Sequence, residues 1–444
     1  MRGWRLAMLN PRWRHLTYAQ LILTFSVVVF AFGPWHYPVS NPLSLFAYLI
    51  AGQLFLAVGY TRADWRVQRP WKSLVRINTL VSVGSILSIT YSLYFGLMKK
   101  YLPSISESIA DIGMAYRITQ SLKDSPDATI FDWARTALSP LVFLPLPIVI
   151  IFWSEIKAHG RILAIAAAVL DAMLWIRRGT NRGLGHLMII IFAAGLLRYA
   201  MRNRKRARLK SMKKIFGLCL AGVLFVAFFT FFTQGRLSRN PLVGEYYTHD
   251  NYTEAYANPD HWLIRIMPPY IGNGILSLSH YWVHGYYGLS LCLQQEFVWA
   301  YGFGHSSALR GLMQSMGIDS SVFTTKTYAA RTEVTTGYPF GIKWHSLYSA
   351  LASDLTFLGA LLAMAGVGML FSTVAREAIQ DRNPFAACVY CCLWITIIFV
   401  PANNQLGMDR RLLLSFYGVF ILWLLSRRKR HRPMSSNALK PGHS

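Results

Sequence analysis

Long apolar runs dominate the pattern of this chain. Ten stretches approach the roughly 20 residues that an α-helix needs to cross a bilayer. Some of them, such as Leu184 to Leu197, are short and must borrow flanking residues, so their boundaries are predicted only to within a few positions. The ten predicted spans begin at Tyr18, Pro42, Ile77, Pro140, Ile162, Leu184, Ile215, Ser346, Ala386 and Leu412.

The charged residues between these runs indicate an orientation. The connections on the side of the two chain ends hold 28 Lys and Arg residues, and those on the other side hold 17. Acidic residues show the opposite bias, with 4 on the first side and 13 on the second. Because cytoplasmic connections retain positive charge, both termini are predicted to be cytoplasmic.

Composition supports a membrane protein. Charged residues make up 14% of the chain, against about 25% in an average soluble domain, and the mean hydropathy is +0.33. A net charge of +26 would suit a nucleic-acid partner, but most of it lies in the predicted cytoplasmic connections, where it contacts membrane lipids instead. Five cysteines exclude a disulfide-built scaffold. We therefore predict a single all-α polytopic integral membrane domain over residues 1–444, with about ten transmembrane helices and no nucleic-acid partner.

Residues 98–139 form the first long outer segment. Ser104 and Glu107 have the spacing of a capping box, and an apolar face runs from Ile105 to Tyr116. This pattern predicts an amphipathic helix on the membrane surface. A surface helix that packs on its neighbours fits the pattern equally well.

Residues 234–345 form the second and larger outer segment, between the seventh and eighth predicted spans. It contains 19 Phe, Trp and Tyr residues and equal numbers of basic and acidic residues, so we expect a folded cap over the outer face. Aromatic faces suit sugar rings, although a belt at the membrane interface is the simpler interpretation for most of them individually. The apolar run 270–293 is predicted to be interfacial or re-entrant, with a further span as the alternative. The segment also holds His249, His261, His280, His284, His305 and His345.

No cofactor or metal is predicted. The sequence has no Walker A loop and no Asp-x-Asp pair that could hold a metal-bound nucleotide sugar. His280 and His284 have helical i, i+4 spacing but lack the intervening Glu of a zinc protease, so a structural or interfacial pair is the favoured interpretation.

Three arginines lie in one short outer turn. Arg177, Arg178 and Arg182 join two predicted spans on the side where positive charge is disfavoured. A guanidinium group matches phosphate oxygens, so the turn indicates an anionic lipid or a lipid diphosphate. The alternative is that these side chains extend to lipid head groups. Asp171 lies less than two turns upstream and is expected to pair with one of the three.

A second group of candidates lies where the large outer segment re-enters the membrane. An intramembrane carboxylate such as Asp354 is a functional candidate by default. His345 is nine residues away, which is about 13 Å along one helix, so a direct pair with Asp354 is not expected. We expect His345 to act at the surface as a base or hydrogen-bond donor, and Asp354 to pair with an arginine deeper in the membrane.

These two groups carry a resemblance. His345-Ser346, Asp354, Thr356 and Gly359 resemble the His-Asn/Ser…Glu-x-Gly-x-x-Gly segment of bacterial O-antigen ligases and Wzy-type polysaccharide polymerases, with Asp in place of Glu and Thr356 at the first glycine. The turn Gly179 to Gly183 similarly resembles the Gly-Ser/Thr-Arg element of these families.

The resemblance implies a GT-C-like glycosyltransferase of the bacterial inner membrane. It would polymerise undecaprenyl-diphosphate-linked repeat units on the periplasmic face, and a chain-length regulator and a flippase of the same pathway would be its partners. A ligase, or a flippase or exporter of lipid-linked sugar, is the alternative. By the resemblance, Arg182 would bind the departing diphosphate and His345 would position or deprotonate the acceptor hydroxyl. Charge and location add Arg177, Arg178, Arg265, Arg331 and Asp354 as substrate-binding candidates.

Overall fold

The computed structural model describes residues 11–65, 75–98, 102–121, 130–201, 211–238, 246, 248–250 and 252–428. Residues 1–10 and 429–444, on whose basic side chains the predicted orientation partly rests, lie outside these ranges.

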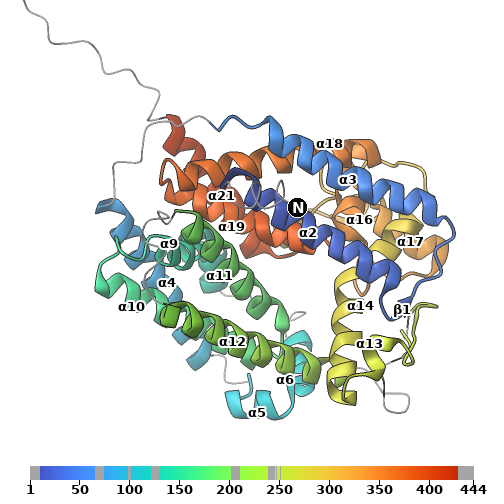
Figure 1. Ribbon diagram of the computed structural model, residues 1–444, viewed down its shortest axis with the longest axis horizontal. Helices are drawn as coiled ribbons and strands as arrows, with labels where there is room; N and C mark the ends of the chain where they lie inside the picture. The colour runs from blue at the N-terminus through green and yellow to red at the C-terminus, as the bar shows by residue number, and fades with distance from the viewer. Residues whose placement is uncertain are drawn as a thin grey trace, which may run out of the picture.

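Helices make up nearly all the regular structure of the described residues, as the all-α prediction requires (Figure 1). The sheet found there consists of two short antiparallel strands, β1 (Trp35–His36) and β2 (Tyr256–Ala257). The longer helices are α2 (Pro11–Phe32), α3 (Pro42–Arg62), α4 (Val75–Met98), α10 (Ala158–Arg177), α11 (Asn181–Met201), α12 (Ser211–Leu237), α14 (Pro269–Cys292), α18 (Ser346–Ile379), α19 (Pro384–Phe399) and α21 (Arg410–Arg428). The shorter helices are α5 (Ile105–Ala110), α6 (Ile112–Ser121), α7 (Ile130–Ala137), α8 (Ser139–Phe143), α9 (Pro145–Ile151), α13 (Trp262–Arg265), α15 (Ser307–Ser315), α16 (Ser321–Thr325), α17 (Tyr328–Thr336) and α20 (Gln405–Met408).

Six of these helices are long and apolar enough to cross a membrane, namely α2, α3, α4, α10, α11 and α18. A seventh crossing results if α7 and the α8–α9 pair, bent by 65° to each other, form one span. The protein is therefore a multi-pass helical membrane protein. Helices occupy all ten predicted stretches, but the described residues support six or seven spans rather than ten.

Helix α19 shows why the count differs. Its 16 residues reach about 24 Å, which is less than the roughly 30 Å of a hydrocarbon core. Nearly every side chain of α19 is buried, and Tyr390 and Trp394 pack on Phe371 of α18 with ring centroids 5.1 and 5.5 Å apart. A helix that is apolar all round belongs inside a protein. Helix α19 is accordingly the centre of the core, surrounded by α2, α9, α11, α18 and α21.

The stretch predicted to span from Pro140 is not one straight helix. Pro140, Pro145 and Pro147 lie in or at the starts of α8 and α9, where each removes a backbone donor. The chain therefore bends here, and the bend brings α7 and α8 against α21.

The amphipathic helix predicted over Ile105 to Tyr116 is two helices. Ser104 and Glu107 form both bonds of the capping box at the start of α5, but α5 ends at Ala110 and α6 follows. Buried Ile112 lies against the turn after α10, because a Cβ at Gly179 would meet the Ile112 carbonyl oxygen. The segment therefore packs on its neighbours, which was the alternative to a membrane-surface helix.

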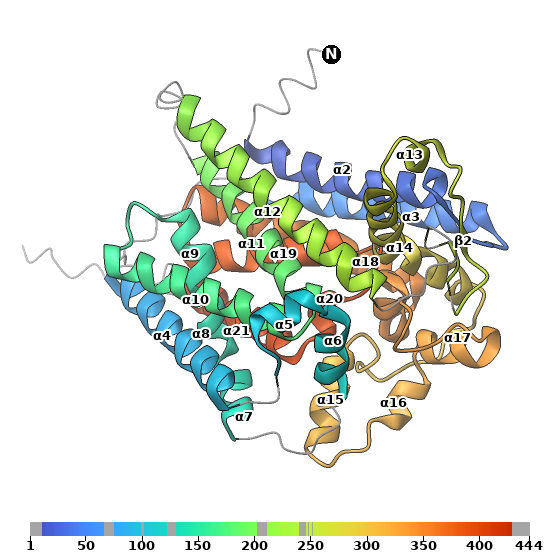
Figure 2. The same ribbon diagram turned by 90° about the horizontal axis from the view of Figure 1, so that it is seen from below.

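The large outer segment is folded around α14. This helix packs between α2 and α12 and also contacts α17 and α18 (Figure 2). Its C-terminal half is buried on almost all sides, and although its 24 residues are long enough, it is not apolar enough to qualify as a span. Of the shorter helices of the same segment, α13 packs on α14, α17 packs on α14 and α18, α15 packs on α20, and α16 packs on α17.

Helices α3 and α18 form the most extensive helix pair. They run parallel, with Gly52 against Tyr348 and Gly59 against the backbone of Ala365. A Cβ at Gly368 would overlap the Leu56 carbonyl oxygen. Glycines thus allow the two backbones to approach closely, which is the usual basis of helix association in membranes.

We predict that Gly368→Ala destabilises the protein by about 1–3 kcal/mol, because a Cβ can enter this contact only if the helices separate. Gly366→Ala is the matched control on the same helix, since no atom lies within 4 Å of its Cβ position. The thermal midpoint of the detergent-solubilised protein should fall for the first variant and not for the second. Equal midpoints would show that the close crossing does not limit stability.

Candidate functional site

Arg177 serves the structure of the outer turn. Its guanidinium donates to the backbone carbonyl oxygens of Gly96, Leu102 and Pro103, at 3.1, 2.8 and 2.8 Å. These bonds fasten the end of α10 to the end of α4 and to the segment before α5. The structure therefore commits the Arg177 donors to backbone acceptors, which leaves little capacity for a phosphate.

Asp171 does not pair with Arg178 or with another arginine of the turn. Arg178 lies over the rings of Phe95 and Trp175. Asp171 accepts from Trp175 Nε1 at 3.0 Å and pairs with Arg135 at 3.3 Å. The expectation that Asp171 pairs with an arginine of the turn is wrong, because α7 brings Arg135 to it instead.

Arg182 pairs with a carboxylate from the far end of the sequence. Its Nη2 lies 2.8 Å from Oδ2 of Asp409, whose Oδ1 is 3.9 Å from Arg411 and accepts the backbone N–H groups of Arg411 and Leu412 at the start of α21. Burial would raise the pKa of Asp409, but the Arg411 and Arg182 guanidiniums outweigh burial and hold this pKa well below its usual value. Asp409 is therefore ionised at neutral pH and fixes both arginines.

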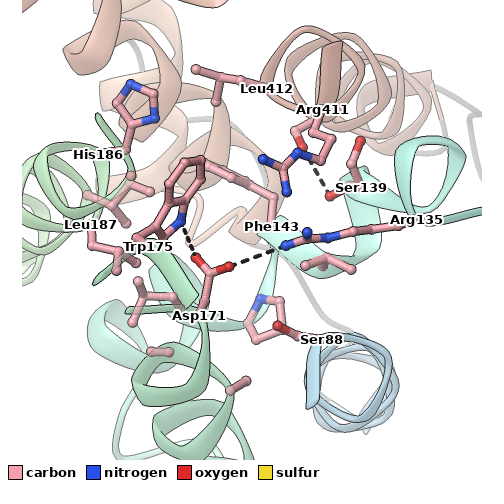
Figure 3. A pocket seen from close by; sticks show the side chains of 18 of the residues that line it. Ser88, Arg135, Ser139, Phe143, Asp171, Trp175, His186, Leu187, Arg411 and Leu412 are labelled. Carbon is pink, nitrogen blue, oxygen red and sulfur yellow. Dashed lines mark hydrogen bonds and ion pairs between the residues drawn. The ribbon is translucent and has the colours of Figure 1, made fainter. Parts of the chain in front are cut away.

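Arg135, Asp171, Asp409 and Arg411 line a cavity of about 150 Å³ (Figure 3). Asp171, Trp175 and His186 enter it from α10 and α11, Arg135 and Ser139 from α7 and α8, and Asp409 and Arg411 from the start of α21. In Figure 3, Asp171 points at Arg135 and Trp175, and Arg411 lies beside Ser139. We call Arg135, Arg178, Arg182 and Arg411 the arginine cluster.

The arginine cluster is not fully neutralised. Four guanidiniums face three carboxylates, Asp132, Asp171 and Asp409, so one positive charge remains. Arg135 is only 8% exposed, and its Nη1 has no partner among the described residues; the same holds for the buried Ser139 Oγ. An incompletely paired buried cation favours an anionic ligand.

Asp354 pairs with a histidine rather than an arginine. Its Oδ2 accepts from His305 Nδ1 at 2.9 Å and from the His305 backbone N–H at 2.8 Å. Its Oδ1 accepts from the backbone N–H groups of Gly302 and Gly304, both at 3.0 Å. Helix α18 is interrupted two residues later at Thr356, where φ is +66°. Glycine adopts such a φ most readily, and Thr356 is the position at which the resembled motif has its first glycine.

One connection, residues 400–411, contacts both His305 and the arginine cluster. We call it the 400–411 segment. The Asn404 amide donates to the His305 carbonyl oxygen at 2.7 Å, and the Gln405 amide contacts His186 Nε2 at 3.0 Å. Asp409 then reaches Arg182. One helical turn, α20, thus separates the contact to His305 from the contact to the arginine cluster, which is roughly 8 Å along a helix axis.

His345 lies next to the beginning of the 400–411 segment. The residue after it, Ser346, donates its backbone N–H to the Ala402 carbonyl oxygen at 2.9 Å. The His345 ring is 7% exposed and packs edge-on against Tyr338 with a centroid distance of 4.8 Å. Burial lowers its pKa to about 3, so the ring is neutral, and Nε2 has no partner among the described residues. No described contact joins His345 to Arg182.

Arg265 and Arg331 are not gathered into this site. Arg265 is exposed on α13, beside the start of α14. Arg331 donates to the carbonyl oxygens of Lys326 and Glu296 and lies over the Tyr328 ring, so it organises its own loop.

The His280 and His284 side chains are held by protein hydrogen bonds. His280 Nδ1 lies 3.0 Å from the Tyr37 hydroxyl, and His284 Nε2 accepts the Trp344 backbone N–H at 3.1 Å. Within the described part of the chain, no group of three or more His, Cys, Asp or Glu side chains has the arrangement of a metal site.

Arg135, His305, Asp409 and Arg411 were not selected from the sequence. A signal existed for two of them, because Asp409-Arg410-Arg411 is a charged triplet in a short connection between apolar runs. For Arg135 and His305 the partner carboxylate lies 36 and 49 residues away, so no local pattern marks either pair.

Comparison with protein-family models, with curated proteins and with solved structures found no match for this chain.

We predict that Arg177→Met destabilises the protein by on the order of 3 kcal/mol, because three backbone carbonyls lose a charged donor. Arg177→Lys should restore little, since one ammonium cannot reproduce the planar fork. Arg265→Met is the control, an exposed arginine of the same outer face. Thermal midpoints measured in detergent test this order, and an unchanged midpoint for Arg177→Met would return that residue to the ligand-binding candidates.

Proposed function

We propose that this protein is a glycosyltransferase that polymerises oligosaccharide repeat units carried on undecaprenyl diphosphate. The observation that carries the proposal is the arginine cluster, which retains positive charge and two of whose members, Arg135 and Arg411, line a cavity between apolar helices. A lipid-linked diphosphate has the chemistry that such a place selects, with anionic oxygens for the guanidiniums and a polyprenyl chain for the membrane.

The proposed reaction needs few groups. The acceptor hydroxyl oxygen forms a bond to the anomeric carbon of the donor sugar, and the bond from that carbon to the diphosphate oxygen breaks. Negative charge grows on the departing diphosphate, so fixed guanidiniums stabilise the transition state more than the ground state. In this proposal Arg182 and Arg411 bind the diphosphate, held in place by Asp409, and Arg135 contributes its free Nη1.

The acceptor hydroxyl must also lose a proton. The resemblance gives His345 the role of positioning or deprotonating this hydroxyl, and the ring lies near the 400–411 segment. Its unpartnered Nε2 can form a hydrogen bond to a hydroxyl, but burial lowers its pKa to about 3 and makes it a weak base, so positioning is the role that the structure supports better. The burial of this ring against Tyr338 requires that the outer segment open before a sugar reaches it.

The membrane setting belongs to the proposal as well. We place the arginine cluster on the periplasmic face of a bacterial inner membrane, in a GT-C-like arrangement with cytoplasmic termini and with α12, α19 and α21 completing about ten crossings. Support comes from the ends of α2 and α21. The Tyr60 hydroxyl, near the end of α3, donates to the backbone carbonyl oxygen of Arg12 at the start of α2. Arg427 of α21 pairs with Glu377 near the end of α18. Because α3 and α18 run parallel, the start of α2 and the end of α21 lie at the end of the bundle opposite the cluster.

Deletion of the gene from its host should leave surface glycans with single repeat units, as seen on a gel of surface polysaccharide. Long lipid-linked polymer would instead indicate a ligase, and the absence of lipid-linked glycan outside the membrane would indicate a flippase. Unchanged polymer length would refute the proposal.

Arg182→Ala, expressed in the deletion strain, should restore less than about 1% of the polymer, because the leaving group loses a guanidinium worth roughly 3 kcal/mol in the transition state. Arg265→Ala, with protein levels matched by immunoblot, should restore normal polymer. Full polymer from Arg182→Ala would remove the arginine cluster from the reaction.

A further inference from the structure

The loop from Trp299 to His305 is held in an unusual backbone conformation by one carboxylate. Tyr301 has φ of +56° and Gly302 has φ of +81°. Asp354, whose side chain is 6% exposed, accepts the N–H groups of Gly302, Gly304 and His305. A non-glycine residue at such a φ costs of order 1 kcal/mol and persists only where the surroundings impose it.

Further contacts fix the same loop. Arg310 Nη1 donates to the carbonyl oxygens of Phe303 and Gly304 at 2.6 and 2.8 Å. Lys326 donates to the Tyr301 hydroxyl at 3.1 Å and lies over its ring. A buried carboxylate and two cations thus fix the conformation of this seven-residue loop.

This shape exposes aromatic rings beside a histidine. Trp299 and Tyr301 are 54% and 47% exposed, with ring centroids 4.9 Å apart and planes tilted by 45°. The His305 side chain is 27% exposed, and Nδ1 is committed to Asp354. No described residue bonds to Nε2. A carboxylate on Nδ1 selects the tautomer in which Nε2 can accept a proton.

We propose that the loop Trp299–His305 is the subsite for the acceptor sugar, with Trp299 and Tyr301 contacting the apolar face of a pyranose ring and His305 as the catalytic residue that takes the hydroxyl proton. This inference rests on the proposed glycosyl transfer. The acceptor O–H bond breaks as its oxygen bonds to the donor's anomeric carbon. The proton passes to His305 Nε2, and the electron pair of the broken glycosidic bond leaves with the diphosphate. Asp354 is a positioning residue that stabilises the imidazolium.

The place of the loop supports this assignment. His305 and the arginine cluster are joined through the 400–411 segment, with Asn404 on the His305 carbonyl oxygen and Asp409 on Arg182. Ser306, next to His305, also donates to the Gly407 carbonyl oxygen at 2.9 Å. A sugar on Trp299 and Tyr301 therefore lies beside a base and on the side of the donor diphosphate.

A membrane-interface belt is the competing explanation for the exposed rings. Belt residues lie on lipid-facing helix positions at the bilayer surface, whereas these rings lie on a pinned loop with positive φ. Lys326 donates to the Tyr301 hydroxyl, and a cation at this place suits sugar hydroxyls. The observations therefore favour a sugar.

The test uses the full-length protein purified in detergent and, as substrate, lipid-linked repeat units extracted from the deletion strain. His305→Ala should lower the polymerisation rate by about 100-fold or more, and His305→Gln should not restore it, because a glutamine cannot take up the proton. The three backbone bonds to Asp354 survive in both variants, so the loop keeps its shape. His249→Ala, an exposed histidine of the same outer segment, should retain the normal rate.

Trp299→Ala should raise the acceptor concentration needed for half-maximal rate by roughly 3- to 10-fold, and Trp299→Phe should restore it, since any aromatic face serves. Trp262→Ala, another exposed tryptophan of the outer segment, is the control. Asp354→Asn keeps one acceptor oxygen for the Gly302 and Gly304 N–H groups but loses the acceptor for His305, so the maximal rate should fall by a much larger factor than the half-maximal concentration rises. If Asp354 only tethered the loop, both quantities would change by similar factors.

A normal rate for His305→Ala, with His345→Ala inactive, would overturn the inference and leave the proposed function standing. Equal losses of membrane-inserted protein in Trp299→Ala and Trp262→Ala, with normal rates per molecule, would identify the rings as an interface belt. Unchanged polymer after gene deletion would instead remove the function itself.

Discussion

The outer end of the bundle depends on the hydrogen bonds and the ion pair made by the 400–411 segment. Backbone and side-chain polar groups in a largely buried connection must find partners, since unpaired groups cost several kcal/mol in an apolar setting. Ala402 meets the first turn of α18, Asn404 meets the loop that ends at His305, and Asp409 meets Arg182 at the start of α11. Three parts of the chain that are far apart in sequence are therefore fixed relative to one another by a few polar contacts.

The same constraint divides the outer arginines into two kinds. Where backbone carbonyls are available, as around Arg177 and Arg331, the guanidinium donates to them and holds neighbouring segments together. Where carboxylates supply the partners, as around Arg135 and Arg182, the charges are shared and donors remain free. Only the second kind is prepared for a phosphate. Position in a turn does not distinguish the two kinds, because it does not reveal which acceptors the neighbouring helices present.

The sequence predicted much of the local structure. The capping box at Ser104, helices at all ten apolar stretches and a folded outer segment follow from periodicity and cap chemistry, which act over a few residues. It could not predict that α19 is enclosed by other helices on all sides, because apolarity alone does not say whether lipid or protein surrounds a helix. It selected Asp354 as a functional candidate but did not predict its partner, since the pairing with His305 crosses 49 residues and depends on a loop with positive φ.

The central claim is that this site transfers a glycan from one lipid diphosphate to another lipid-linked glycan. The most direct measurement places the purified protein in liposomes with lipid-linked repeat units as the sole substrate, and counts both elongated glycan and released polyprenyl diphosphate. The account predicts one diphosphate lipid released for each new glycosidic bond. Movement of the lipid across the bilayer without bond formation, or no elongation by protein that is folded and inserted, would contradict it.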